Sequence, residues 1–133
     1  MYQTIMVPVD LAHADRLEKA IAAAATLSRV NAATLHFVGV TPGAPTEVAR
    51  NPAAFAAKLE NFAAVQGELH GVPVKAHAVV HNDVDRALDD QIKALGADLV
   101  VMASHKPGLK EFVLGSNAGH LAAHSPISVF VVR

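Results

Sequence analysis

Short apolar runs and longer amphipathic stretches alternate along the whole chain. Runs rich in β-branched residues predict five strands, at 4–10, 33–40, 72–80, 97–103 and 127–133. Between them, apolar residues recur at the spacing of a helix that buries one face. This spacing predicts helices over 14–27, 55–69 and 84–95, and a short fourth helix that begins near Gly115 or Ser116.

Residues with strong turn and cap preferences separate these segments. Gly71 and Gly96 follow the second and third predicted helices, where glycine commonly ends a helix. Asn82 or Asp83 can cap the start of the third helix. Residues 41–52 contain three prolines and one glycine, which predicts an irregular surface loop.

Strict alternation of strands and helices predicts an α/β fold with one parallel sheet, right-handed crossovers and helices on both faces. A length of 133 residues suits a single domain over 1–133. Such sheets bind ligands beyond the carboxyl ends of their strands, where the strand order reverses. Two short segments lie at expected strand ends: Pro8-Val9-Asp10 and Met102-Ala103-Ser104.

Composition excludes several partners and compartments. The net charge is −1 and no basic stripe is visible, so we expect no nucleic-acid partner. The chain has no cysteine, which fits a reducing compartment. Pro8 and Asp10 interrupt the first apolar run, and the alanine-rich stretches are too short to span a bilayer. We therefore expect a soluble, cytoplasmic protein with no membrane partner.

Gly115-Ser116-Asn117 stands at an expected helix start. Free N–H groups and the helix dipole favour an anion there, and glycine lets a phosphate approach the backbone. Serine and asparagine are also preferred N-caps, and on this fragment alone capping is the simpler interpretation. The sequence contains no G-x-x-x-x-G-K-[ST], G-x-G-x-x-G or G-x-S-x-G motif.

Other polar residues leave alternatives open. Asp10 could accept hydrogen bonds from a ribose or an adenine amine, or could cap a turn. His105 and Lys106 could meet a phosphate or stay solvated. Eight histidines invite a metal hypothesis, and His120 and His124 lie four residues apart on the last predicted helix, but no third ligand follows at a persuasive spacing. We therefore expect no metal site.

Three segments carry a resemblance to a known family: "PVD", "ADLVVMAS" and "LGSNAGHLAAHSPISVFVVR". Together they resemble the universal stress protein family over the whole chain, and in particular a branch with a short "SHxP" loop before "LGSN". The resemblance implies a flavodoxin-like (Rossmann-like) three-layer sandwich with strand order 3-2-1-4-5. It also implies an adenine nucleotide, ATP, which Mg²⁺ could accompany, at the junction of strands one and four.

The family's ATP pattern is a glycine, two residues, a glycine, nine residues, then glycine with serine or threonine. Gly115 and Ser116 match its last pair, and Ala103 stands at its first glycine. The loop is one residue shorter between Met102 and Gly115, so the second glycine has no counterpart. The resemblance implies a site built from Pro8, Val9, Asp10, Val38 and Gly39 around adenosine, Met102, Ala103, Ser104, His105 and Gly108 in the loop, and Gly115, Ser116 and Asn117 at the phosphates.

The last strand suggests how copies of the chain associate. Residues Ile127 to Val132 form an almost continuous apolar run, and the expected strand order puts them at the sheet edge. An apolar edge strand is an aggregation hazard unless it is covered, so we expect a homodimer through this strand.

Two functions follow from these expectations. The first is an ATP-binding regulatory module with slow or no turnover, at most a weak ATPase or an autophosphorylating protein, because no base or nucleophile is arranged for fast hydrolysis. The second is a dimeric stress or interaction protein that binds no nucleotide, which Ala103 and the shortened loop favour. The protein partner stays open.

Overall fold

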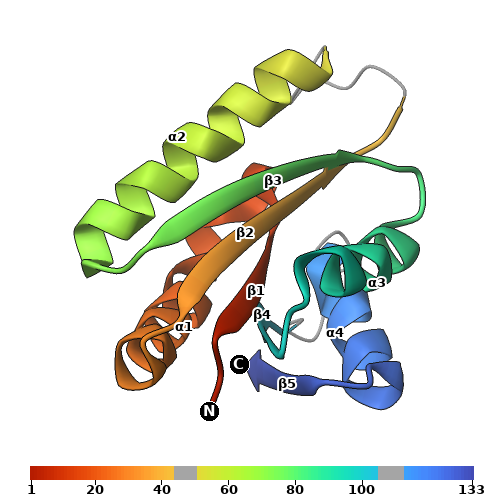
Figure 1. Ribbon diagram of the computed structural model, residues 1–133. Coiled ribbons are helices and arrows are strands. Elements are labelled where there is room, and N and C mark those ends of the chain that lie inside the picture. The colour runs from red at the N-terminus through yellow and green to blue at the C-terminus, as the bar shows by residue number, and fades with distance from the viewer. Residues whose placement is uncertain (44–50, 105–112) are drawn as a thin grey trace.

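The computed structural model describes residues 1–43, 51–104 and 113–133, and their strands and helices alternate as the sequence predicts (Figure 1). The strands are β1 (Thr4–Val9), β2 (Thr34–Thr41), β3 (Val74–Val80), β4 (Leu99–Ala103) and β5 (Ser128–Val132). The helices are the 3-10 helix η1 (Leu11–Leu17) and the α-helices α1 (Glu18–Asn31), α2 (Pro52–His70), α3 (Val84–Leu95) and α4 (Val113–His124).

All strand pairs are parallel, and the sheet has the order β3-β2-β1-β4-β5. The expected flavodoxin-like fold is therefore confirmed. The helices α1 and α2 pack on one face, and α3 and α4 pack on the other, which gives three layers (Figure 1). The order reverses between β1 and β4, so the chain has one switch point within the described sheet.

Alternating side chains of the strands build two cores. Ile5, Val7 and Phe37 join the core under α1 and α2, whereas Met6 and Val38 join the core under α3 and α4. All five side chains are at most 1 % exposed. Each contributes about 1.5–3 kcal/mol relative to an exposed side chain. The alternation of two buried faces explains why β1 reads as a continuous apolar run.

Helix ends follow the expected caps closely, with two differences. Gly71 and Gly96 end α2 and α3 with left-handed φ values of 63° and 64°, and the Asp83 side chain accepts a hydrogen bond from the N–H of Arg86. The first helix is longer than predicted because it opens as the 3-10 helix η1. The last helix begins at Val113, slightly before the predicted start. Most of the predicted loop, 44–50, lies outside the described residues.

Gly39 in β2 is required by packing. A Cβ added there would lie 2.9 Å from Cζ of Phe55 and 3.1 Å from Cδ2 of Leu59, both on α2. Phe55 and Leu59 are themselves buried, so they cannot retreat into solvent. The missing side chain thus lets α2 lie directly on β2.

We predict that Gly39→Val destabilises the fold by about 1–3 kcal/mol, because it overpacks the contact between β2 and α2. Urea unfolding gives the change in free energy. The matched control is Gly119→Ala, where an added Cβ meets nothing within 4 Å in helix α4. It should be stabilising, by about 0.5–1 kcal/mol. Equal stability of Gly39→Val and wild type would contradict this packing role.

His36 of β2 and His77 of β3 meet on the α3/α4 face of the sheet. Nδ1 of His36 lies 2.9 Å from Nε2 of His77, and the ring planes differ by 15°. Burial lowers the pKa of His36, and the charges of His77 and Lys75 lower it further. Burial and then Lys75 lower the pKa of His77. The pair is therefore neutral at neutral pH, with one ring donating to the other.

The histidine pair should make folding stability fall on acidification. As the pH falls below the ordinary pKa of 6.5, the unfolded chain takes up protons that the folded pair resists. In EDTA-containing buffer, the loss of unfolding free energy between about pH 7.5 and about pH 5.5 should therefore be smaller in the double variant His36→Gln/His77→Gln. The exposed His124→Gln variant should behave as wild type. Equal losses in wild type and double variant would refute the prediction.

Candidate functional site

The candidate site lies at the carboxyl ends of β1 and β4, beyond the end of their ladder. β1 pairs with β2 as far as Val9, which lies opposite Gly39. Its pairing with β4 stops much earlier, at Met6 opposite Val100. The β1–β4 ladder thus ends at the switch point, where α/β proteins place ligands, and we call this end of the ladder the opening.

Pro8 explains why the pairing stops. The carbonyl of Gln3 accepts from Thr34 of β2, whereas the carbonyl of Thr4 accepts from Asp98, just before β4. Alternate residues of β1 therefore direct their backbone N–H and C=O groups to opposite neighbouring strands. Pro8 lies four residues after Thr4, so its backbone nitrogen also faces β4. Proline has no N–H to donate, so the next rung of the ladder cannot form.

Asp10 leaves β1 at this opening and caps the helix that follows. Its Oδ1 accepts a hydrogen bond from the N–H of Ala12 at 3.1 Å, and its Oδ2 lies 2.9 Å from Nδ1 of His13. The capping role that the sequence left open is therefore present. His13 was not expected at this site, and its backbone angles (φ −130°, ψ 36°) interrupt the helical geometry of η1. The spacing of three residues between Asp10 and His13 was the only sequence signal for this contact.

Ser104 leaves β4 beside the same opening. Its N–H donates to the carbonyl of Val132 at 2.8 Å, and its side chain is partly exposed. Asp10 is also partly exposed. Among the candidates on or directly after the strands, these two residues therefore have side chains that can reach a ligand directly.

Six candidates on the strands are buried. The buried set comprises Pro8, Val9, Val38, Gly39, Met102 and Ala103. The side chains of Val9 and Ala103 pack in one core and those of Val38 and Met102 in the other, so these four residues offer a ligand mainly their backbone atoms. Gly39 in particular has its missing side chain directed at Phe55, which accounts for glycine there without a ligand.

The phosphate side of the expected site is only partly described. His105 and Gly108 lie outside the described residues. Gly115, Ser116 and Asn117 lie near the start of α4, with Gly115 in its first turn. The first N–H groups of a helix have no partner within it, so Gly115 belongs to an anion-attracting end.

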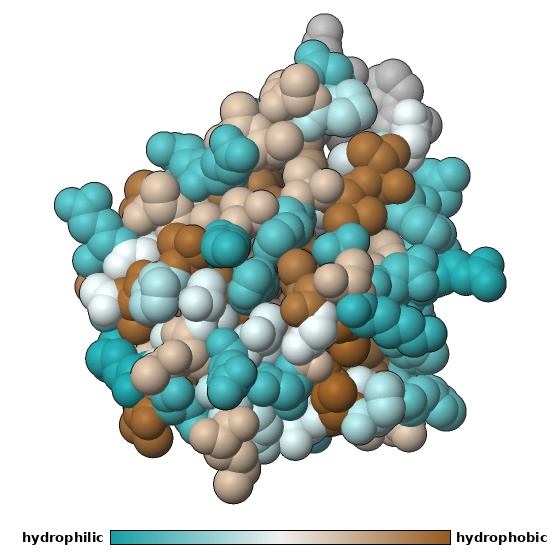
Figure 2. Space-filling view, viewed as in Figure 1, coloured by the Kyte–Doolittle hydropathy of each residue, from teal (hydrophilic) through white to brown (hydrophobic). Residues whose placement is uncertain are grey.

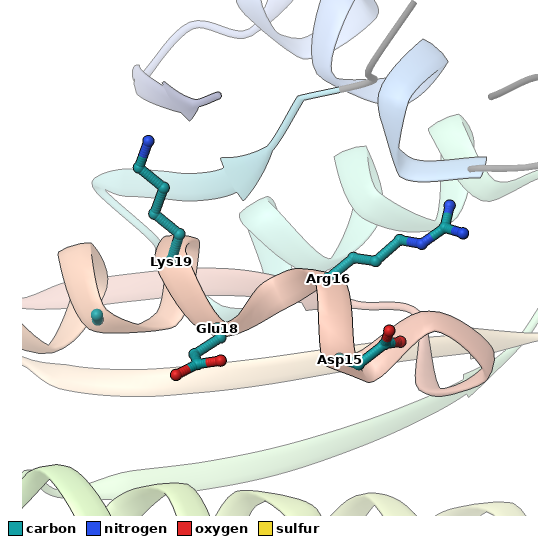
Figure 3. A pocket seen from close by; sticks show the side chains of 5 residues that line it. Asp15, Arg16, Glu18 and Lys19 are labelled. Carbon is teal, nitrogen blue, oxygen red and sulfur yellow. The ribbon is translucent and has the colours of Figure 1, made fainter. Parts of the chain in front are cut away.

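A separate shallow hollow of about 390 Å³ lies against η1 and α1 (Figure 3). It is lined by Asp15, Arg16, Glu18, Lys19 and Ala22. Figure 3 shows Arg16 and Lys19 pointing away from the side on which Glu18 lies. Nζ of Lys19 donates to the carbonyl of Arg133 at 2.6 Å. Charged side chains around one alanine do not form the apolar walls of a cofactor pocket, so we assign no ligand there.

Histidine and carboxylate contacts elsewhere are pairwise. Nε2 of His120 lies 3.2 Å from Oδ2 of Asp89, and the rings of His120 and His124 lie 5.1 Å apart, tilted by 45°. Across the described ranges, no three histidine or acidic side chains come together as metal ligands. In the same ranges, no helix has the length and apolar character needed to cross a membrane.

Comparison with known proteins identifies the family. The model of the universal stress protein family matches residues 1–133. Universal stress protein G of Escherichia coli O157:H7 is 27 % identical over 143 residues, covering 100 % of both chains.

Two solved structures share the fold. A universal stress protein of Archaeoglobus fulgidus in complex with dAMP has a TM-score of 0.74 at 18 % identity, covering 99 % of this chain and 98 % of that one. A universal stress protein in complex with cAMP has a TM-score of 0.75 at 21 % identity, covering 99 % and 97 %. With the family model spanning the whole chain, the conclusion is that this chain belongs to the universal stress protein family.

Proposed function

We propose that this chain is a cytoplasmic regulatory module that binds ATP at the opening between β1 and β4. The early end of the β1–β4 ladder at Met6 and Val100 carries the proposal, because it leaves an opening at the switch point. Asp10 and Ser104 flank this opening. The dAMP and cAMP complexes of similar proteins support an adenine nucleotide as the ligand.

In this proposal, Asp10 accepts hydrogen bonds from the adenosine moiety while its Oδ1 keeps the cap of η1. Each carboxylate oxygen can accept more than one hydrogen bond, so the cap does not use up the side chain. The phosphates lie at the start of α4, over Gly115 to Asn117, with Mg²⁺ bridging them. Turnover is slow or absent in this proposal, since the Asp10 carboxylate engages the adenosine moiety rather than the phosphates.

Ser116→Asp tests the phosphate side. It should raise the Kd for ATP by about 10-fold or more, because it sets a like charge against the phosphates. Isothermal titration measures the Kd, and Ser116→Asn is the matched uncharged control. The purified wild type should also release adenine nucleotide on denaturation, seen by mass spectrometry. If the wild type binds no adenine nucleotide at millimolar concentration, the ATP-binding proposal is wrong. The alternative, a dimeric interaction protein that binds no nucleotide, is then favoured.

Asp10→Asn tests the adenosine side without removing the cap, because asparagine is as good an N-cap as aspartate. One acceptor oxygen becomes an amide that only donates, so the Kd for ATP should rise about 10-fold. Asp15→Asn changes the net charge equally outside the opening and should leave the Kd unchanged. Any turnover at saturating ATP should stay as in wild type. Lost turnover with unchanged binding would instead make Asp10 catalytic.

We also propose that two copies pair through β5, the edge strand beside β4. The N–H of Ser104 donates to Val132, so Val132 and Phe130 bond toward β4, whereas the backbone of Val129 and Val131 faces the edge. Phe130 is 48 % exposed. Antiparallel pairing about a two-fold axis would satisfy the edge groups and cover this ring. Elsewhere, hydrophilic and hydrophobic residues are interspersed on the face in Figure 2.

Val129→Pro removes one donor from the open edge and none from the ladder with β4. Light scattering should therefore show a dimer for wild type and a monomer for Val129→Pro, while circular dichroism shows a folded chain for both. Val129→Ile keeps the N–H and should remain dimeric. A wild type that is monomeric at micromolar concentrations would contradict the proposed β5 interface. A Val129→Pro variant that remains dimeric would contradict it as well.

A further inference from the structure

The contact between His36 and His77 has the form of a metal-binding pair. The two residues are 41 positions apart, yet parallel pairing of β2 with β3 places them on one face, with Nδ1 and Nε2 at 2.9 Å. The ring centroids lie 5.1 Å apart, so the facing nitrogens account for most of that separation and the rings meet edge to edge. We propose that His36 and His77 bind a divalent transition-metal ion of borderline softness, such as Zn²⁺ or Cu²⁺, with water completing its coordination.

The spacing of the two nitrogens fits one shared ion. Zinc binds imidazole nitrogen at about 2.0–2.1 Å with near-tetrahedral angles, which separates two ligand nitrogens by about 3.3 Å. The facing nitrogens lie almost in line, so each ring must turn by about 35° to point its lone pair at a shared tetrahedral ion as the nitrogens separate from 2.9 Å. Imidazole nitrogen suits Zn²⁺, Cu²⁺ and Ni²⁺, whereas Mg²⁺ prefers oxygen ligands.

A change of tautomer can free both facing nitrogens for the metal without releasing a proton from the pair. In the metal-free pair, one neutral ring donates an N–H to the lone pair of the other. On binding, that proton moves to the opposite nitrogen of its own ring through solvent. Both facing nitrogens then offer lone pairs to the ion, and no net proton is lost. The lowered pKa values of both histidines keep the rings neutral, which is the state that binds metal.

The pair is reachable from solvent. Both histidines are partly exposed, and no residue of β3 is fully buried. On this face α3 packs on β1 and β2, and α4 packs on β4 and β5, so β3 lies beyond the main cover of these helices (Figure 1). Lys75, opposite His36 in the register, brings a positive charge that opposes the bound ion.

His120 and His124 form the competing pair. They lie four residues apart on α4, with rings 5.1 Å apart and tilted by 45°. Nε2 of His120 is already engaged by Asp89, and His124 is exposed. Each pair must give up an existing contact of these nitrogens before it can chelate through them, but the nitrogens of His36 and His77 already lie 2.9 Å apart.

The test is titration of the metal-stripped, nucleotide-free full chain with Zn²⁺ near neutral pH. We expect saturable binding of one ion per chain by calorimetry, with the ring nitrogen resonances of His36 and His77 shifting in NMR spectra. His36→Gln and His77→Gln should each weaken binding by about 10-fold or more, since one imidazole remains. His120→Gln should leave the affinity unchanged, and Mg²⁺ should not compete.

Lys75→Gln adds a test that does not alter a ligand. Removing a like charge from this half-exposed neighbourhood should tighten Zn²⁺ binding by about fivefold, and the gain should shrink in high salt. The proposal is overturned if Zn²⁺ leaves the His36 and His77 ring resonances unshifted. It is equally overturned if His120→Gln abolishes binding while His36→Gln does not.

Discussion

The missing N–H of Pro8 is the constraint on which the proposed site depends. β1 is the central strand, and its neighbours β2 and β4 lie on opposite sides of the switch point. A residue with an N–H at position 8 could add a rung toward β4 and continue the ladder past Met6. Proline prevents this while its side chain stays within the sheet. The opening therefore follows from the backbone chemistry of Pro8 and does not require a loop to move.

The rest of the fold holds this opening in place. Buried side chains on both faces of β1 fix the strand, and Gly39 lets α2 press directly on β2. Asp10 then turns the chain from β1 into η1 with both carboxylate oxygens engaged. The residues at the opening are thus held by strand ends and a capped turn, the arrangement that places a binding group accurately.

Local chemistry made most of the fold predictable from the sequence. Apolar periodicity indicates the five strands and the four α-helices but not η1, and Gly71, Gly96 and Asp83 mark ends that the structure confirms. The end of α1 carries no such signal, because it is closed by Ala32 with a left-handed φ of 54°, a conformation that sequence rules assign to glycine.

The site was less predictable because it depends on which strands become neighbours. Pro8 was recognised as part of "PVD", but its effect follows only from the hydrogen-bond direction along β1. The histidines look scattered until β2 and β3 pair, and then His36 and His77 meet. Gly39 was expected to admit a ligand, which stays a prediction, and the structure adds a packing reason for glycine there, the Phe55 ring sixteen residues away on another element.

The central claim is that the opening between β1 and β4 is the nucleotide site, and amide chemical-shift mapping tests it most directly. On titration of the ¹⁵N-labelled chain with ATP, the largest shifts should fall on Asp10 to His13, on Ser104 and on the first turns of α4. Amides of β3 and the outer surface of α2 should stay unchanged. Shifts centred on the hollow beside Lys19, or no shifts at millimolar ATP, would contradict the account.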